Sequence, residues 1–276
     1  MMGVTGMNDS KAMGSLANKM LSFVNTALVH DSNYDIAVIL LKNYTALKKM
    51  SIGEIADLCY VSKATISRFC RFMGFDNFKE FHSYLEMDFK MNTDYSQKFY
   101  AMLCKDQQLA LSAYRDELIS NIYSTVAPEN LVSMPEIVKT LHDCNRIAYF
   151  SHHFLWDIGH YFQSKMMMMG RYVEQFLDHN GQLTCARSLG KDDLAIVCSV
   201  AGSYPSRYPT LWDAIASSGC RLLVITQNMS SPYWNFADYI LRCGNSNQDD
   251  VGKYSALMIT DMMVINYLKQ YDRDSF

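Results

Sequence analysis

The order of apolar segments after Pro128 constrains the fold more than any other feature of the chain. Short apolar, β-branched or aromatic runs alternate there with segments long enough for helices, such as 154–170 and 209–219. Strands that alternate with helices form βαβ units, and such strands run parallel. The sequence therefore predicts a five-stranded, doubly wound α/β domain of the flavodoxin type, in which ligands bind at the carboxyl ends of the strands. The expected strands are 146–151, 172–176, 194–200, 221–227 and 239–243.

The first third of the chain has a helical pattern and no strand pattern. Apolar side chains recur there three and four positions apart, as at Phe78, Phe81 and Leu85. We therefore expect an all-α domain followed by the α/β domain, joined by a polar connecting helix or linker. The expected boundaries are 1–95 for the all-α domain, 96–127 for the connection and 128–276 for the α/β domain.

The charge of the chain does not by itself indicate a nucleic-acid partner. Its 276 residues include 25 Lys and Arg against 28 Asp and Glu, a formal net charge of −3. A DNA-binding function must therefore rest on where the basic side chains lie. The eight cysteines form no CxxC pair, which favours reduced thiols over a metal or redox site. Residues 1–15 lack the pattern of a secretory signal, and no apolar run approaches the ~20 residues of a membrane helix, so we expect a cytoplasmic protein.

The stretch 51–74 has the pattern of two short helices joined by a tight turn. Ser62 is a good N-cap for the second helix, and Gly74 is typical of the position that ends one. Periodicity alone fits a solvated amphipathic hairpin as well as a recognition helix that enters the major groove. In the second helix Ile66, Phe69, Cys70 and Met73 should point inward, and Lys63, Ala64, Ser67, Arg68 and Arg71 outward.

This stretch resembles the helix-turn-helix of the RpiR family of bacterial regulators. The family pattern reads roughly I-x-E-I-A-x-x-x-x-V-S-x-A-T-I-x-R-F-x-x-x-[LM]-G-F-x-x-F-x-E-F, and the chain matches it from Ile52 to Phe81. One departure is Tyr60, where many helix-turn-helix proteins have Gly. Tyrosine there must adopt a left-handed backbone conformation, at a modest energetic cost.

The resemblance implies that the chain is a dimeric transcription regulator that binds a palindromic DNA operator. By the same resemblance, six residues of this chain are expected to contact DNA. Arg68 is our first choice for a contact to a base, whereas Lys63 and Arg71 are expected to meet phosphates, which gives affinity without sequence discrimination. The six are Ser62, Lys63, Thr65, Ser67, Arg68 and Arg71.

RpiR regulators follow this domain with a SIS (sugar isomerase) domain that binds phosphosugars, and the predicted strands agree with it in number and order. The family's loop S-x-S-G-x-T corresponds to residues 199–204, where Ala201 replaces the second Ser and Tyr204 the Thr. Its loop G-x-G-x-S corresponds to 151–155, where both Gly and the Ser are replaced and two histidines appear. The ligand residues that the resemblance implies are Ser199, Gly202, Ser203, Thr226 and Ser231.

These replacements leave two interpretations of the SIS-like domain. It either still binds a small anionic metabolite, by resemblance a phosphosugar, and so controls genes of sugar metabolism, or it has lost the ligand and serves dimerisation. In the second case, the chain would be an effector-free dimeric DNA-binding scaffold. Near the end of the chain, the family's Arg before the last helix appears as Lys253.

The remaining alternative is an enzyme, a phosphosugar isomerase built on the same domain. Isomerisation needs a positioned base, and no motif marks one among the acidic residues near the strand ends. We therefore expect no catalytic residue and no cofactor. His153, Asp157 and His160 share helical spacing, but such residues are more often surface or capping groups than metal ligands, so we expect no metal. The acidic residues near strand ends are Asp178, Asp192, Asp193, Asp249 and Asp250.

Overall fold

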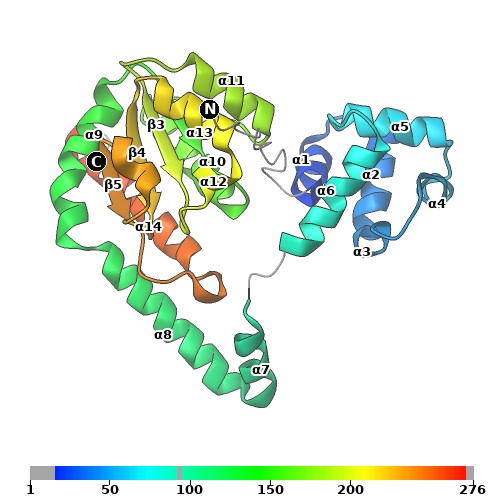
Figure 1. The fold of residues 1–276 in the computed structure, drawn as a ribbon, viewed down its shortest axis with the longest axis horizontal. Coiled ribbons are helices and arrows are strands. Elements are labelled where there is room, and N and C mark those ends of the chain that lie inside the picture. The colour runs from blue at the N-terminus through cyan, green and yellow to red at the C-terminus, as the bar shows by residue number, and fades with distance from the viewer. Residues whose placement is uncertain (1–15, 92–94, 272–276) are drawn as a thin grey trace, which may run out of the picture. The chain divides into compact units, whose positions relative to one another are not determined.

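The structure is a computed structural model that describes residues 16–91 and 95–271. The start of the predicted all-α domain, residues 1–15, lies outside this description, as do 92–94 and 272–276. The described residues form two compact units, 16–91 and 95–271 (Figure 1).

The first unit consists of helices packed around one apolar core. Ser51 starts α4 with a capping box, in which its N–H donates to Glu54 Oε2 at 2.7 Å and its Oγ accepts from Glu54 N–H at 3.3 Å. The core includes Met20, Leu40 and Phe81, all buried. The helices are α1 Leu16–Thr26, α2 Ser32–Lys42, α3 Tyr44–Leu47, α4 Ile52–Leu58, α5 Lys63–Phe72 and α6 Phe78–Met91.

The second unit is a five-stranded, all-parallel sheet between two layers of helices (Figure 1). The strand order β2-β1-β3-β4-β5 is that of flavodoxin-like folds, so the predicted fold class is confirmed. The strands are β1 Ile147–Phe150, β2 Val173–Gln175, β3 Leu194–Cys198, β4 Arg221–Thr226 and β5 Tyr239–Arg242. The helical segments are α7 Gln97–Lys105, α8 Gln107–Thr125, α9 Pro128–Asp143, α10 Phe154–Met168, α11 His179–Ser188, α12 Tyr204–Arg207, α13 Pro209–Ser217, η1 Pro232–Phe236, η2 Gln248–Asp250 and α14 Gly252–Tyr271.

Alternation along each strand gives the sheet two buried faces. In β1, Ile147 and Tyr149 pack against α9, α10 and α14, whereas Ala148 and Phe150 pack against α11 and α13. Because both faces are covered, the strands are apolar throughout, as in other parallel sheets. Ligands can therefore reach the sheet only at its ends, where the loops are.

The segment between the predicted domains holds α7 and α8, and α8 is anchored to the α/β unit. Asn121 is buried in α8, and its Nδ2 donates to Ser246 O at 2.7 Å. Its Oδ1 accepts from the N–H groups of Asn245 and Ser246 at 2.7 and 2.9 Å. One amide side chain thus satisfies three backbone groups of the loop that follows β5.

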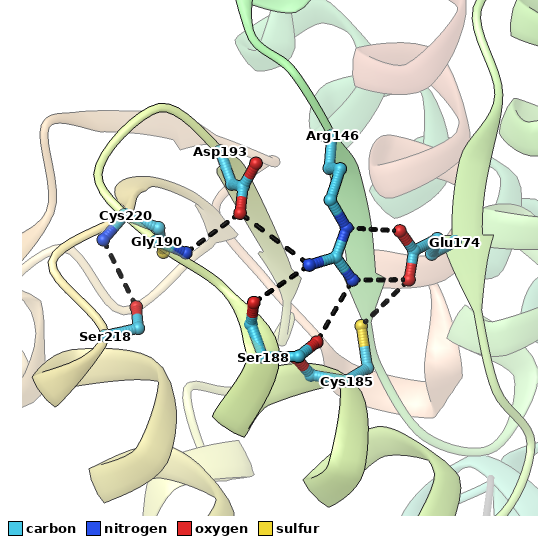
Figure 2. Close-up of polar contacts among 8 residues, drawn as sticks. All are labelled: Arg146, Glu174, Cys185, Ser188, Gly190, Asp193, Ser218 and Cys220. Atoms are coloured by element: carbon cyan, nitrogen blue, oxygen red, sulfur yellow. Dashed lines mark hydrogen bonds and ion pairs between the residues drawn. The ribbon is translucent and has the colours of Figure 1, made fainter.

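A polar cluster lies at the amino ends of the strands (Figure 2). It is opposite to the carboxyl ends of the strands, where a ligand is expected and which we call the ligand edge. Arg146 binds Glu174 in bidentate fashion, with Nε–Oε1 and Nη2–Oε2 distances of 2.7 and 2.9 Å. It also donates to Ser188 O at 2.9 Å, and its Nη1 lies 3.8 Å from Asp193 Oδ2. The cluster therefore ties β1 to β2, α11 and the start of β3.

Candidate DNA-binding helix and ligand loops

The turn between α4 and α5 is a complete Schellman motif. Val61 N–H donates to Ala56 O at 2.9 Å, and Tyr60 N–H donates to Asp57 O at 3.1 Å. Tyr60 takes the left-handed position of the motif with φ 56°, as its departure from the family pattern required. Its side chain is 93% exposed, so the ring meets no steric obstacle there.

Helix α5 is fixed at both ends by local hydrogen bonds. Ser62 Oγ accepts from Thr65 N–H at 3.1 Å, which confirms the predicted N-cap. At the other end Gly74, with φ 84°, closes a second Schellman motif through the bond from Phe75 N–H to Cys70 O at 2.9 Å. The residues predicted to point inward are all buried: Ile66, Phe69, Cys70 and Met73.

The six predicted DNA contacts lie on the opposite face of α5, and three of them touch one another. Thr65 Oγ1 lies 2.9 Å from Ser62 Oγ and accepts a hydrogen bond from Arg68 Nη2 at 3.2 Å. Thr65 thus holds the Arg68 guanidinium over the first turns of the helix. Ser62, Lys63, Arg68 and Arg71 are exposed, and Thr65 and Ser67 are half-buried.

Lys63 leans from α5 toward the first turn of α4. A Cβ atom at Gly53 would come within 3.1 Å of Lys63 Cε, so the glycine leaves room for the lysine stem. The sequence of α5 contains no acidic residue. Its outward face is therefore cationic although the chain as a whole has a net charge of −3.

In the loop after β3, the hydroxyl of Ser199 is hydrogen-bonded within the loop itself. Ser199 Oγ accepts from Tyr204 N–H at 3.1 Å, and Ser199 O accepts from Gly202 N–H at 2.9 Å. Gly202 has φ 74°, and Asn228 packs so closely that a Cβ on Gly202 would lie 3.0 Å from Asn228 Cβ. The helix that follows, α12, is only four residues long.

Tyr204 fills the interior behind this loop. Its hydroxyl donates to Gln182 Oε1 at 2.6 Å, and its ring stacks on His152 with centroids 5.9 Å apart. The side chain is fully buried. The residue that replaces the family's Thr therefore packs into the core, and this bond directs its hydroxyl to α11.

The loop after β4 is tied to the loop after β3. Thr226 Oγ1 donates to Val200 O at 3.3 Å and accepts from Asn228 N–H at 3.1 Å. Ser231, which is buried, precedes η1 without capping it. The five predicted ligand residues thus lie on two loops at the same edge of the sheet, with Ser199 and Thr226 engaged in holding those loops together.

The loop after β1 has a positive φ at one of the positions where the family pattern has Gly. His153 stands at that position, and its φ is 52°. Burial, followed by the nearby His153 and Arg207, lowers the pKa of His152 to about 3. Ser151 Oγ, His152 Nδ1 and His153 Nε2 are buried without a hydrogen-bond partner. The two histidines are visible in the sequence, but the packing of His152 against Tyr204 has no local signature there.

Within 16–91 and 95–271, no group of three His, Cys, Asp or Glu side chains is placed to hold a metal ion. In the same ranges, every helix is too short or too polar to cross a membrane.

Comparisons with known proteins agree with both units. Residues 25–92 match the model of the rpiR-family helix-turn-helix domain. An uncharacterized HTH-type transcriptional regulator of Haemophilus influenzae is 27% identical over 258 residues, which cover 91% of this chain and 88% of the relative. A second such regulator, from Caldanaerobacter subterraneus, is 24% identical over 212 residues, covering 75% and 73% of the two chains.

Among solved structures, NanR of Vibrio vulnificus, determined in complex with ManNAc-6P, superimposes with a TM-score of 0.53. It is 18% identical, and the match covers 92% of each chain, which shows a shared fold. The helix-turn-helix and the parallel α/β domain thus occur in the predicted order. The chain is therefore similar to HTH-type transcriptional regulators: residues 25–92 form an rpiR-family helix-turn-helix domain, and a parallel α/β domain with the fold of the NanR structure follows it.

Proposed function

We propose that the chain acts as a homodimer that binds a palindromic operator through α5 and senses a phosphorylated sugar at the carboxyl edge of its sheet. The observation that carries the first part is the outward face of α5, where Lys63, Arg68 and Arg71 are exposed on a helix without acidic residues. Two copies of α5 spaced by one turn of the duplex would read the two half-sites.

The residues of α5 divide into two roles. Arg68 lies near the middle of the helix, and Thr65 orients its guanidinium toward the N-terminal turns. It is therefore the side chain we assign to a base edge, where Arg reads guanine by two hydrogen bonds. Lys63 and Arg71 flank it and contact phosphates. Ser62 and Ser67 add hydrogen bonds to the DNA backbone, which fix the register of the helix.

The sensing part rests on the arrangement of the two loops. Gly202 and Ser203 face the same edge of the sheet as Ser231, and a phosphate needs such hydroxyls and backbone N–H groups. NanR, which shares this fold, was solved with a phosphosugar. Binding would exchange the internal bonds of Ser199 and Thr226 for bonds to the ligand, and the genes controlled would be those of sugar metabolism.

The acidic residues near the strand ends support a regulator over an isomerase. Asp178 Oδ1 accepts from Gly181 N–H at 2.9 Å as the cap of α11, and Asp193 belongs to the amino-edge cluster. Asp249 and Asp250 bind Ser96 and Lys253. Four of the five candidates thus have structural partners, and we propose no catalytic base among them.

The sensing proposal is tested by a thermal-shift screen of sugar phosphates, ManNAc-6P among them, at millimolar concentration. A ligand that binds the folded state must raise the melting temperature. Ser203→Asp should abolish this rise by repelling the phosphate, whereas Ser120→Asp, on the exposed surface of α8, should leave it intact. If no sugar phosphate stabilises the chain, the α/β domain is an effector-free dimerisation domain.

A further inference from the structure

Two consecutive residues before α14 hold a strained backbone. Asp249 and Asp250 have φ values of 48° and 61°, in the left-handed region that non-glycine residues occupy uncommonly, although Asp does so more often than most. Such conformations persist where neighbouring groups hold them, and they cluster in ligand clamps and switch regions. The contacts of these two carboxylates therefore decide what the turn does.

Each carboxylate of the turn has a different partner. Asp249 Oδ1 accepts from Ser96 N–H at 2.6 Å, and Asp250 Oδ2 pairs with Lys253 Nζ, also at 2.6 Å. Ser96 is the N-cap of α7, where its Oγ accepts from Phe99 N–H at 3.0 Å. Asp249 consequently fixes the first turn of α7, close to the boundary between the two units at residues 93 and 94.

Aromatic side chains also hold the first turn of α7. We call the groups that contact this turn, namely Asp249 and the rings of Tyr95, Phe99 and Tyr114, the seat of α7. The rings of Tyr95 and Phe99 lie 5.7 Å apart, and Phe99 lies 5.8 Å from Tyr114 of α8. Burial and a hydrogen bond with Tyr254, in the first turn of α14, raise the pKa of Tyr114. The start of α7 is thus held by groups that come from α8 and from the turn that leads into α14.

Lys253 joins this seat to the ligand edge. Its Nζ lies 5.4 Å from the centroid of the Phe154 ring, and Phe154 is the first residue of α10, directly after His153. The same ammonium pairs with Asp250 and is largely buried, with 19% of the side chain exposed. One cation therefore contacts the first residue of α10 and pairs with one of the two carboxylates of the strained turn.

We propose that the Asp249–Asp250 turn is a latch for the first turn of α7, and that an anionic ligand at the carboxyl edge opens it by drawing Lys253 away from Asp250. This inference rests on the proposed sensing function. Without Lys253, two adjacent carboxylates in a strained turn repel each other, and the turn relaxes. Asp249 then releases Ser96, which frees the first turn of α7. The ligand acts because it binds the open form more tightly than the latched form.

The latch is tested by hydrogen exchange of the full chain, read on peptides that cover 95–101. Asp249→Gly, which tolerates the positive φ and removes the acceptor of the Ser96 N–H, should raise exchange there about tenfold, as expected from the loss of a hydrogen bond to a charged group. Lys253→Met should produce a similar rise without any ligand. Lys139→Met removes the same charge from an exposed site on α9 and should leave these peptides at the wild-type rate.

The outcomes separate the latch from the sensing function. If Lys253→Met exchanges at the wild-type rate in 95–101, the latch is wrong whether or not a ligand binds. If ManNAc-6P raises the melting temperature but leaves exchange in 95–101 unchanged, sensing stands and the latch is overturned. If no sugar phosphate raises the melting temperature, the sensing function is wrong. Faster exchange of 95–101 in Lys253→Met would then still show that Lys253 stabilises the contact between Asp249 and the first turn of α7.

Discussion

The Tyr204 hydroxyl donates a 2.6 Å hydrogen bond to Gln182 Oε1, deep beneath the loop after β3. Gln182 in turn donates from Nε2 to Ser151 O and Phe176 O, at 3.0 and 2.9 Å. The pair therefore links three loops at the ligand edge through buried groups. A tyrosine where the family pattern has threonine has become part of the scaffold of the site.

Tyr204→Phe should lower the free energy of unfolding of the α/β unit by about 1–3 kcal/mol, because buried Gln182 Oε1 loses this donor while the packing volume is kept. The measurement is urea unfolding followed by circular dichroism. Tyr123→Phe, at a tyrosine that is 84% exposed, is the matched control and should be neutral. A Tyr204→Phe variant as stable as the control would show that the bond contributes nothing.

Tyr60→Gly should stabilise the helix-turn-helix unit. Relief of the left-handed backbone is worth about 1–2 kcal/mol, and the greater freedom of glycine in the unfolded chain offsets about 0.5–1 kcal/mol of it. No packing is lost because the ring is exposed. Tyr60→Val is the informative counterpart, since a β-branched residue should destabilise the same turn. Equal melting temperatures for the two variants would contradict the role assigned to φ at this position.

Arg146→Ala should destabilise the α/β unit by about 1–2 kcal/mol at neutral pH, a range reduced for the exposed part of the guanidinium. The variant leaves Glu174 and Asp193 without their shared cation (Figure 2). Arg146→Lys keeps the charge but loses the bidentate geometry, so its stability should lie between those of Ala and wild type.

The same cluster makes the effect dependent on pH. The hydrogen bond from Arg146 lowers the pKa of Glu174 from its ordinary value of 4.5. A lowered pKa in the folded state stabilises the protein above pH 4.5, and this stabilisation disappears as the pH falls through the folded value. The difference between wild type and Arg146→Ala should therefore shrink below pH 4.5 in unfolding experiments. A difference that stays constant down to pH 3 would contradict this linkage.

Local features of the fold could be predicted from the sequence. The five apolar runs specified the strands because burial on both faces leaves no other composition open to a parallel strand. Ser62 and Gly74 marked the ends of α5 because capping needs only neighbouring backbone groups. Even the left-handed Tyr60 followed from its position in the helix-turn-helix pattern.

Contacts between distant segments could not be predicted in this way. Asn121 meets residues 245 and 246, and Ser96 meets Asp249, yet neither pair has a local signature in the sequence. The same holds for the ligand loops. Ser199 and Thr226 could be placed on them, but their internal bonds depend on how the β3 and β4 loops pack together.

The most direct test of the account is the affinity of the full chain for an operator fragment selected from genomic DNA, measured by fluorescence anisotropy at fixed salt. Arg68→Ala should weaken operator binding about 10-fold or more, as expected for a lost bidentate contact to a base, and should change binding to a scrambled duplex much less. Lys139→Ala removes one positive charge from the α/β unit and should bind both duplexes like wild type. Unchanged operator affinity for Arg68→Ala would contradict the assignment of α5 as the recognition helix.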